Sequence, residues 1–404
     1  MIAIAILGHG VVGSGVAEVL HHNEKGIAAK AGDTIRVKRI LDLRSFPDLP
    51  YADLFTTDFQ DILNDAEIRI VVETMGGLHP AYDFVKACLL AGKSVVTSNK
   101  EVVAAYGCEL TRLAQEKGVC YLFEASVGGG IPIIRPLSQC LAANDILELR
   151  GILNGTTNYI LTRMIRAGLS FEEALAEAQA LGYAERDPSA DVLGHDACRK
   201  ICILSDIAFG RHIAPEQVPA EGITGITLAD VDYAAAAGKK IKLLGRAIRK
   251  EDGKVCALVA PHLVDNSNPL SGVEDVFNAI AVRGDAVGDV MFYGRGAGKL
   301  PTASAVAADV IDIANHQGQR KVISWADGGD DVVCSADTLK SVWYVRAMAS
   351  ESTLQSALPN AKVLERAGAE EGVSACITDG EMTRAELEQS LVGVELLSVL
   401  RVLD

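Results

Sequence analysis

The chain has few aromatic residues and no excess of positive charge. Only 5% of its 404 residues are Phe, Trp or Tyr, and its formal net charge at pH 7 is −15. Proteins that bind nucleic acids need clustered Lys and Arg for the phosphates and often stack aromatic rings on the bases. The composition therefore argues against a nucleic-acid partner, although it leaves room for a small substrate that carries an amino group.

Long apolar runs and paired cysteine motifs are also missing. No apolar run approaches the roughly 18 residues that span a membrane, and residues 1–7 lack the basic start of a signal peptide. The nine cysteines are scattered, and no CxxC pair occurs. Such a pattern favours thiols in a reducing compartment over a disulfide framework. We therefore expect a cytoplasmic protein that does not enter a membrane.

The N-terminal sequence predicts a strand, a glycine-rich turn and a helix. Residues 2–7 are apolar, Gly8-His9-Gly10-Val11-Val12-Gly13 follows at once, and residues 11–22 have a helical pattern. In such a GxGxxG turn the glycines permit a tight turn, a close approach of the backbone to a diphosphate, and close packing of helix on strand. The N–H groups at the start of the helix then face the phosphates. A glycine turn without a ligand is the alternative.

Asp42 ends the second apolar segment, residues 35–42. An acidic residue at that place binds the adenosine ribose hydroxyls of NAD. It lies 29 residues beyond Gly13, further than the usual spacing of about 20, and we assign the excess to a loop or extra turn at 23–34. Arg44 and Arg39 are close enough in sequence to hold the 2′-phosphate of NADP instead. The cofactor is therefore NAD or NADP, with a slight preference for NAD.

The spacing of apolar segments predicts three parts. Strand-like and helical segments alternate over residues 1–130, which is typical of an α/β fold with a doubly wound parallel sheet of the Rossmann type. An α+β domain follows at 131–325, and its helix 301–316 is able to pack back on the first domain. Residues 338–404 have the order βαββαβ of a ferredoxin-like domain. We expect further strands at 68–73, 94–97, 119–123, 147–153 and 255–262, and helices at 80–91, 101–117, 158–167, 171–181 and 190–209.

Acidic side chains gather around one lysine in residues 178–200. Glu185, Asp191 and Asp196 precede Lys200. Asp196 and Lys200 are four residues apart, so they share a face of a helix. An acid and an amine held beside a substrate are able to transfer a proton, and carboxylates suit the ammonium group of an amino acid. The alternative is a solvent-exposed pair of little energetic consequence.

The same stretch resembles the signature of homoserine dehydrogenases. The matching positions are Ala178, Gly182-Tyr183-Ala184, Asp187-Pro188, Asp191-Val192, Gly194, Asp196 and Lys200. Four further segments are similar to that family, namely 97–100 (TSNK), 124–132 (EASVGGGIP), 151–158 (GILNGTTN) and 293–304 (YGRGAGKLPTAS). The resemblance implies a catalytic and dimerisation role for residues 131–325. It also implies the interconversion of L-homoserine and L-aspartate 4-semialdehyde with NAD(P), in threonine, methionine and isoleucine biosynthesis.

The resemblance implies a set of site residues as well. Lys200 is the expected general acid and Asp196 its positioning partner, and the substrate-binding residues are Glu185, Asp191, Asp196 and Lys100. The expected cofactor contacts are Gly8, Gly10, Val11, Val12, Gly13, Asp42, Arg44, Lys100, Gly182 and Gly298. Backbone carbonyls at Glu124, Val127, Gly129 and Ile131 match positions that hold a sodium or potassium ion, although the glycines there also suit an interdomain hinge. At 151–158 we expect Thr157 or Asn158 to cap a helix.

Residues 338–404 resemble the ACT domains that end many bacterial homoserine dehydrogenases. They depart from that pattern in the turn after the first strand, Met348-Ala349-Ser350-Glu351-Ser352, which lacks the usual glycine. Effector binding, including threonine feedback, and a purely structural or dimerisation role therefore both stay open. The resemblance further implies a homodimer or homotetramer.

Two other functions fit parts of the sequence. An aldehyde-oxidising dehydrogenase needs a thiolate nucleophile with a base beside it, and no cysteine stands in a suitable strand-to-helix turn. A sensor built from Rossmann and ACT-like domains would bind its ligands without turnover, and the presence of Lys100, Glu185, Asp196 and Lys200 argues against it. Oxidation of NADPH that depends on aspartate semialdehyde distinguishes the enzyme from the sensor.

Overall fold

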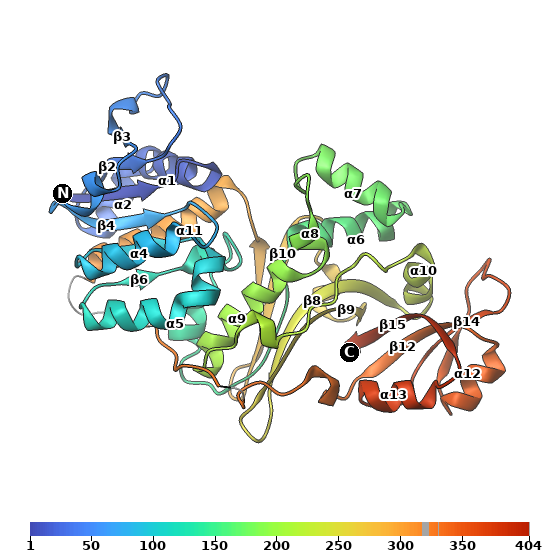
Figure 1. Cartoon of the computed structure of the whole chain (residues 1–404). Coiled ribbons are helices and arrows are strands. Elements are labelled where there is room, and N and C mark those ends of the chain that lie inside the picture. Colours follow the sequence, from blue (N-terminus) through green and yellow to red (C-terminus); the bar gives the residue numbers. More distant parts are fainter. Residues whose placement is uncertain (317–322, 330, 404) are drawn as a thin grey trace. The chain divides into compact units, whose positions relative to one another are not determined.

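The computed structural model describes residues 1–316, 323–329 and 331–403. The chain forms two compact units (Figure 1). The first unit comprises Met1–Asp145, Cys202–Ala214 and Gly294–Gly329, and the second comprises Ile146–Ile201, Pro215–Tyr293 and Asp330–Asp404. The domain boundaries at 1–130, 131–325 and 338–404 stay a prediction.

The first unit contains a parallel sheet of six strands in the order β3-β2-β1-β4-β5-β6. This order is that of the Rossmann fold, as the sequence predicts. The strands are β1 (Ile2–Leu7), β2 (Ile35–Leu41), β3 (Phe55–Thr56), β4 (Ile68–Glu73), β5 (Ser94–Thr97) and β6 (Tyr121–Leu122). The helices are α1 (Val11–His22), α2 (Glu24–Ala31), α3 (Gln60–Leu63), α4 (Ala81–Leu90), α5 (Lys100–Glu116) and α11 (Lys299–Asn315).

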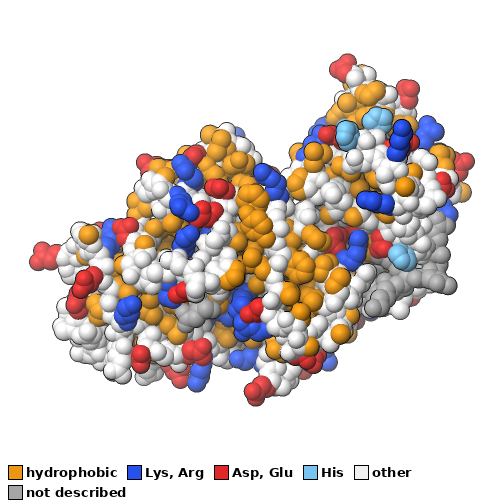
Figure 2. Space-filling model, turned by 180° about the vertical axis from the view of Figure 1, so that it is seen from behind, with side chains coloured by type: hydrophobic (Ala, Val, Ile, Leu, Met, Phe, Trp, Pro, Cys, Tyr) orange, Lys and Arg blue, Asp and Glu red, His pale blue; other side chains and the backbone are white. Residues whose placement is uncertain are grey.

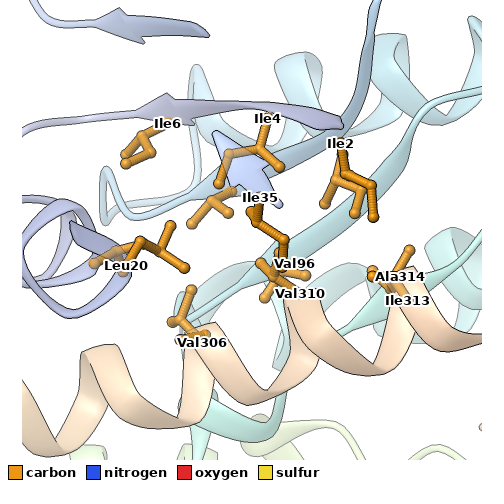
Figure 3. Packing of buried hydrophobic residues seen from close by; sticks show 14 of the residues in the cluster. Ile2, Ile4, Ile6, Leu20, Ile35, Val96, Val306, Val310, Ile313 and Ala314 are labelled. Atoms are coloured by element: carbon orange, nitrogen blue, oxygen red, sulfur yellow. The ribbon is translucent and has the colours of Figure 1, made fainter. Parts of the chain in front are cut away.

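One hydrophobic cluster joins this sheet to α1, α2 and α11. Ile2, Ile4 and Ile6 alternate along β1 and point toward Val306 and Val310 of α11 (Figure 3). A Cβ atom on Gly15 would lie only 2.8 Å from the Lys299 carbonyl oxygen, so a glycine permits the close approach of α1 and α11. The C-terminal helix of this unit therefore completes the layer that begins with the glycine turn.

The second unit contains a sheet of nine strands in the order β11-β10-β7-β8-β9-β15-β12-β14-β13. The strands are β7 (Ile146–Ile152), β8 (Lys239–Arg249), β9 (Val255–Asp265), β10 (Phe277–Gly284), β11 (Gly288–Arg295), β12 (Val342–Met348), β13 (Lys362–Leu364), β14 (Val373–Ile377) and β15 (Glu395–Leu403). The helices are α6 (Gly155–Ala167), α7 (Phe171–Ala180), α8 (Ser189–Val192), α9 (His195–Phe209), α10 (Leu228–Ala236), α12 (Glu351–Ala357) and α13 (Arg384–Ser390). The boundary between the two units falls within α9.

The C-terminal part of the second unit has the element order β12-α12-β13-β14-α13-β15. Its strands lie in the order β15-β12-β14-β13, which is the ferredoxin-like arrangement expected from the sequence. Thr383 and Glu386 form a capping box at the start of α13. Strand β15 also pairs in parallel with β9 over Arg401–Leu403. The ferredoxin-like strands thus continue the sheet that contains β7.

Some predicted elements are wrong. Residues 23–34 contain the two-turn helix α2, which buries Ile27 and Ala31, where we expected a loop or extra turn. The helix expected at 190–209 is divided into α8 and α9, because Gly194 has a φ of +84° that ends the first helix. Strands β8, β10 and β11 and helix α10 were not predicted. Among the described residues, no helix combines the length and apolar character that crossing a membrane requires.

Replacing Ile4 tests the core of the first unit. Ile4 is fully buried in the cluster between β1 and α11, so Ile4→Ala should lower the free energy of unfolding by about 2–5 kcal/mol through lost burial and a cavity. Urea denaturation measures this change. Leu43→Ala is the control, because Leu43 is 87% exposed, and it should change stability by no more than about 0.5 kcal/mol. Equal effects of the two substitutions would contradict this assignment of the core.

Candidate active site

Asp196 and Lys200 form a buried ion pair on α9. Their side chains are 7% and 10% exposed, and the Lys200 Nζ atom lies 2.7 Å from Asp196 Oδ2. Lys200 also donates a hydrogen bond of 2.7 Å to the carbonyl oxygen of Leu153, at the end of β7. An ammonium group has three N–H donors, and the third has no acceptor among the residues that the structure describes. The pair is therefore not the solvent-exposed contact that its spacing also allowed.

Asn154 connects this pair to Asp191. The Asn154 Nδ2 group donates hydrogen bonds to Asp191 Oδ1 at 2.7 Å and to Asp196 Oδ2 at 2.8 Å. Its Oδ1 atom accepts the backbone N–H of Thr157 at 2.8 Å, so Asn154 is the N-cap of α6. The expectation that Thr157 or Asn158 caps this helix is wrong. The sequence did contain a signal for this cap. Asparagine is a preferred N-cap residue, and Asn154 stands between the predicted strand and the predicted helix.

Asp191 and Asp196 place two carboxylates beside one lysine. Burial raises the pKa of Asp191, and the charge of Asp196 raises it further, while hydrogen bonds from Asn154 and Thr156 and the charge of Lys200 lower it. Paired carboxylates of this kind suit an ammonium group, which supplies donors and an opposite charge. The Lys200 ammonium is hydrogen-bonded to Asp196 at the same place.

The turn that contains Gly182 and Glu185 is tied to α6 by its backbone. Gly182 has a φ of +74°, and the carbonyl oxygen of Tyr183 accepts a hydrogen bond of 2.8 Å from Thr156 Oγ1. Glu185 is exposed, and only its carbonyl oxygen has a hydrogen bond, from Gln179. Within the described part of the chain, its carboxylate has no contact with Asp191, Asp196 or Lys200.

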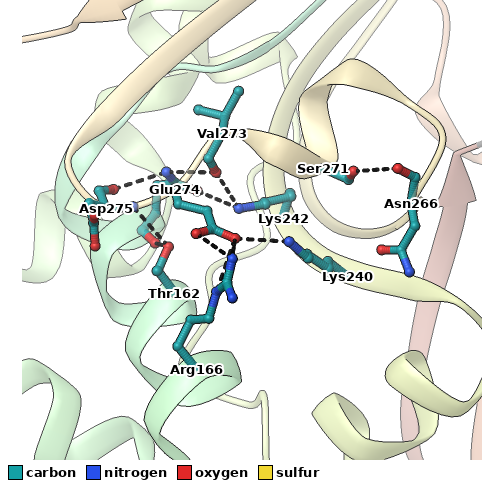
Figure 4. Close-up of polar contacts among 10 residues, drawn as sticks. Thr162, Arg166, Lys240, Lys242, Asn266, Ser271, Val273, Glu274 and Asp275 are labelled. Atoms are coloured by element: carbon teal, nitrogen blue, oxygen red, sulfur yellow. Dashed lines mark hydrogen bonds and ion pairs between the residues drawn. The ribbon is translucent and has the colours of Figure 1, made fainter.

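A second polar network contacts α6 at several points along its length (Figure 4). Lys242 on β8 is 1% exposed, and it donates to Asn158 Oδ1 at 3.1 Å and to the carbonyl oxygen of Val273. Burial lowers the pKa of Lys242 to about 8. Glu274 accepts hydrogen bonds from Arg166 on α6 and from Lys240 on β8. These contacts fix α6, and therefore its capping residue Asn154, to the sheet.

The glycine turn of the first unit fits a diphosphate. A Cβ atom on Gly13 would lie 1.9 Å from the Gly8 carbonyl oxygen, whereas one on Gly10 would meet nothing within 4 Å. Gly10 is the N-cap of α1 and provides no side-chain hydrogen bond. The N–H groups at the start of α1, including those of Val11 and Val12, therefore remain for phosphate oxygens.

Asp42 and Arg44 lie together in a cavity of about 410 Å³ at the end of β2. Asp42 accepts hydrogen bonds from the His9 N–H at 2.7 Å and from Arg44 Nε and NH2 at 3.0 and 2.9 Å. These contacts, above all those from Arg44, hold the pKa of Asp42 well below its usual range. Asp42, the expected contact for the ribose hydroxyls of NAD, is thus hydrogen-bonded to Arg44, the expected contact for the 2′-phosphate of NADP.

Lys100 is the first residue of α5 and follows β5 directly. Asn99 caps this helix, and Thr97 Oγ1 donates to the buried Glu73 carboxylate at 2.5 Å. Burial raises the pKa of Glu73. Lys100 therefore lies at the carboxyl edge of the parallel sheet, the edge where ligands bind in such folds.

The carboxylate of Glu124 accepts hydrogen bonds from backbone N–H groups. It accepts the N–H groups of Ile133, Ile134 and Arg135 at 2.7, 2.9 and 2.8 Å. A cation here would therefore bind carbonyl oxygens, and those of Val127, Gly129 and Ile131 accept no hydrogen bond from any described residue. No group of acidic, cysteine or histidine side chains in the described ranges could hold a metal ion.

Gly129 and Gly298 shape the loop beside these carbonyls. Gly129 has a φ of +53°, and a Cβ atom there would lie 2.5 Å from the Gly296 carbonyl oxygen. Gly298, with a φ of +123°, is the N-cap of α11. Both positions require glycine, so the two glycine-rich segments pack closely within the first unit.

A substitution tests the role of the Glu124 side chain. In Glu124→Gln, one oxygen that accepts a backbone N–H becomes an amide NH2 group, which leaves a buried donor facing another donor. We expect a loss of about 1–3 kcal/mol in unfolding free energy, measured by urea denaturation. Glu116→Gln on the surface of α5 is the control and should change little. Unchanged stability of Glu124→Gln would mean that the carboxylate does not organise residues 133–135.

The two sites define a class of protein. A Rossmann sheet with a glycine turn, combined with a buried carboxylate and lysine site, is typical of a nicotinamide-dependent oxidoreductase.

Known proteins identify the family. The sequence matches the family models "Homoserine dehydrogenase, NAD binding domain" over residues 8–124 and "Homoserine dehydrogenase" over residues 132–311. The homoserine dehydrogenase of Synechocystis sp. is 47% identical over 321 residues, which cover 77% of this chain and 73% of that protein. The chain belongs to the homoserine dehydrogenase family.

Solved structures agree with this assignment. A homoserine dehydrogenase from Thiobacillus denitrificans aligns with a TM-score of 0.89 and 36% identity, covering 100% of this chain and 98% of that chain. A hyperthermophilic archaeal homoserine dehydrogenase in complex with NADPH aligns with a TM-score of 0.66 and 30% identity, covering 77% of this chain and 97% of that chain. The α/β fold class is confirmed, whereas the ACT-like nature of residues 338–404 stays a prediction.

Proposed function

We propose that the protein interconverts L-homoserine and L-aspartate 4-semialdehyde with NAD(P) as hydride carrier. The observation that carries this proposal is the buried cluster of Asp191, Asp196 and Lys200 around Asn154. The cluster belongs to a chain whose other unit has a dinucleotide-binding turn. The activity places the enzyme in threonine, methionine and isoleucine biosynthesis.

The substrate's charged groups determine which residues bind it. Asp191 and Asp196 are the proposed receptors for the ammonium group, because a desolvated ammonium needs charged acceptors. Glu185 is a further proposed contact; its carboxylate is exposed and therefore able to turn toward a ligand. Lys100 is proposed to contact substrate and cofactor from the carboxyl edge of the first sheet.

Lys200 is the proposed general acid. The bound nicotinamide supplies hydride chemistry at the C4 carbon of the substrate. In the reducing direction, Lys200 donates the proton of its third N–H to the carbonyl oxygen, which becomes the hydroxyl of homoserine. In the oxidising direction, the neutral amine takes the hydroxyl proton back. Asp196 and the Leu153 carbonyl oxygen hold the Nζ atom in place for both steps.

Dinucleotide binding is proposed for Gly8, Gly10 and Gly13 at the diphosphate, with further contacts from Val11, Val12, Asp42, Arg44, Lys100, Gly182 and Gly298. A sodium or potassium ion is proposed at the carbonyl oxygens of Glu124, Val127, Gly129 and Ile131, since such ions prefer oxygen ligands. The open carbonyls described above support this assignment.

A homodimer or homotetramer is also proposed. Strand β11 lies at the edge of the nine-stranded sheet, and its Met291 and Tyr293 are 41% and 54% exposed. An exposed apolar edge strand favours pairing with another chain. Figure 2 shows that hydrophobic side chains are exposed on the face seen from behind. A cytoplasmic location is proposed from the scattered cysteines.

An aldehyde-oxidising mechanism finds no support in Cys88, Cys256 or Cys376. Such a mechanism requires a cysteine with a lowered pKa. Burial instead raises the pKa of Cys88 and of Cys256 to about 12 and that of Cys376 to about 11.

The reaction is tested by measuring nicotinamide reduction that depends on L-homoserine, with NAD⁺ and NADP⁺ in parallel at alkaline pH. A clear rate with either cofactor supports the proposal, and their ratio gives the cofactor preference. Folded protein that binds a dinucleotide but reduces none of it would contradict the proposal and favour a sensor.

Lys200→Ala tests the proton transfer. Loss of a general acid should lower kcat by about 10²–10⁴-fold, while dinucleotide affinity, measured by fluorescence titration, stays within about twofold because the cofactor's proposed diphosphate site lies in the first unit. Lys25→Ala on the exposed face of α2 is the control and should retain full activity. A kcat of Lys200→Ala within tenfold of the original would remove Lys200 from this role.

Arg44→Ala and Asp42→Ala test cofactor choice as a matched pair. Arg44→Ala should raise the KM for NADP by about tenfold or more and spare NAD, because a phosphate loses its charged partner. Asp42→Ala should weaken NAD more than NADP, because the ribose hydroxyls lose their acceptor. Initial rates with both cofactors measure each ratio. Parallel losses with NAD and NADP in both variants would make the pair structural.

A further inference from the structure

The neutral side chain of Asn154 contacts both carboxylates of the proposed substrate site, Asp191 and Asp196. Its orientation is fixed by its two ends. Oδ1 accepts the Thr157 N–H at 2.8 Å, so Nδ2 must face the opposite way, toward Asp191 and Asp196. An amide nitrogen has two N–H donors, and here each carboxylate receives one.

The two carboxylates have unequal support apart from Asn154. Asp196 is paired with Lys200 at 2.7 Å, whereas Asp191 forms no ion pair with any described residue and accepts hydrogen bonds from Asn154 and Thr156. Like charges held close together in a buried place favour protonation of one of them. A protonated Asp191 would lose its charge attraction for an ammonium group. The site therefore needs a donor that serves both carboxylates without adding charge.

We propose that Asn154 is a positioning residue whose amide NH2 group keeps the carboxylates of Asp191 and Asp196 together, ionised and aimed at the substrate's ammonium group. This inference rests on the proposed function and gives a role to Asn154, which lies in the family-like segment 151–158 but was not among the expected site residues. Asn154 also holds Asp196 beside Lys200, since Asn154 Nδ2 and Lys200 Nζ both donate to Asp196 Oδ2.

The position accepts other capping residues, which allows a sharp test. Asn154 has a φ of −130° and a ψ of 121°, an extended conformation that Ser and Asp adopt without strain. Both residues cap helices about as well as Asn. Asn154→Ser keeps the cap and replaces the two amide N–H donors by one short hydroxyl, whereas Asn154→Asp keeps the cap and adds a third carboxylate beside the first two.

The charged and polar groups around Asp191 determine the expected pH response. Asp196 and burial raise its pKa, and Asn154, Thr156 and Lys200 lower it. Removing the Asn154 donors raises the pKa of Asp191 further, so the carboxylate becomes protonated at a higher pH. Homoserine binding needs the ionised form and should therefore be lost at a higher pH as the solution is acidified.

The experiment compares pH profiles of kcat/KM for homoserine. In Asn154→Ser the acid limb should move up by about one pH unit, with KM for homoserine raised about tenfold at neutral pH and KM for NADP within about twofold. Asn154→Asp should move the limb at least as far. Ser170→Ala, which removes the cap of α7 but none of these contacts, should lower stability and leave the profile unchanged.

A double-mutant cycle with Asp191→Asn separates charge from structure. Without the Asp191 charge, the repulsion between the carboxylates of Asp191 and Asp196 is absent, and the Asn154 donors matter less. The combined loss in kcat/KM should therefore be smaller than the product of the single losses by about threefold or more. An unmoved acid limb in Asn154→Ser, or multiplicative losses in the cycle, would overturn the inference while the unsubstituted enzyme stays active. An inactive unsubstituted enzyme would instead refute the proposed function.

Discussion

Burial of charge at the end of β7 is the constraint on which the second unit depends. Asp196 and Lys200 are buried there, and removing an ion from water costs several kcal/mol unless partners replace the solvent. The chain supplies these partners from adjacent residues: the carbonyl oxygen of Leu153 and the side chain of Asn154. One turn of backbone therefore sets the position of the lysine and of its acid. The glycines on either side have a packing reason, since a Cβ atom on Gly151 or Gly155 would lie 2.9 Å from a carbonyl oxygen of a neighbouring segment.

The first unit meets the same constraint with backbone donors. Glu124 accepts the N–H groups of Ile133, Ile134 and Arg135, and Asp42 accepts that of His9. Glu124, whose two carboxylate oxygens already accept three backbone N–H groups, organises residues 133–135. This distinction separates Glu124, whose side chain is structural, from Asp191, whose carboxylate adjoins the lysine. The two acidic residues therefore differ in the groups that donate to them: backbone N–H groups at Glu124, and the side chains of Asn154 and Thr156 at Asp191.

The sequence predicted the parts of this protein that depend on local pattern. The glycine turn, the first sheet and the Asp196–Lys200 spacing follow from strand and helix periodicity and from the geometry of glycine. Helix α2 was missed because Ile27 and Ala31 bury against a distant helix, α11. Strand β8 was missed because it carries charged residues such as Lys242, whose burial depends on acceptors from Asn158 and Val273. Asn154 was overlooked as a site residue because its contacts lie 37 and 42 residues away in sequence.

The ferredoxin-like strands are part of the same sheet as β7 in the second unit. Strand β15 pairs with β9, and only β9 and β8 lie between β15 and β7 in the order of the described sheet. A buried ion pair adds a second attachment, because Arg346 on β12 donates to Asp230 on α10 at 2.9 Å and Tyr344 donates to the same carboxylate at 3.0 Å. Loss of either Arg346 or Asp230 would leave the other as an uncompensated buried charge. Because β15 is hydrogen-bonded directly to β9, the ferredoxin-like strands and β7 belong to one continuous sheet.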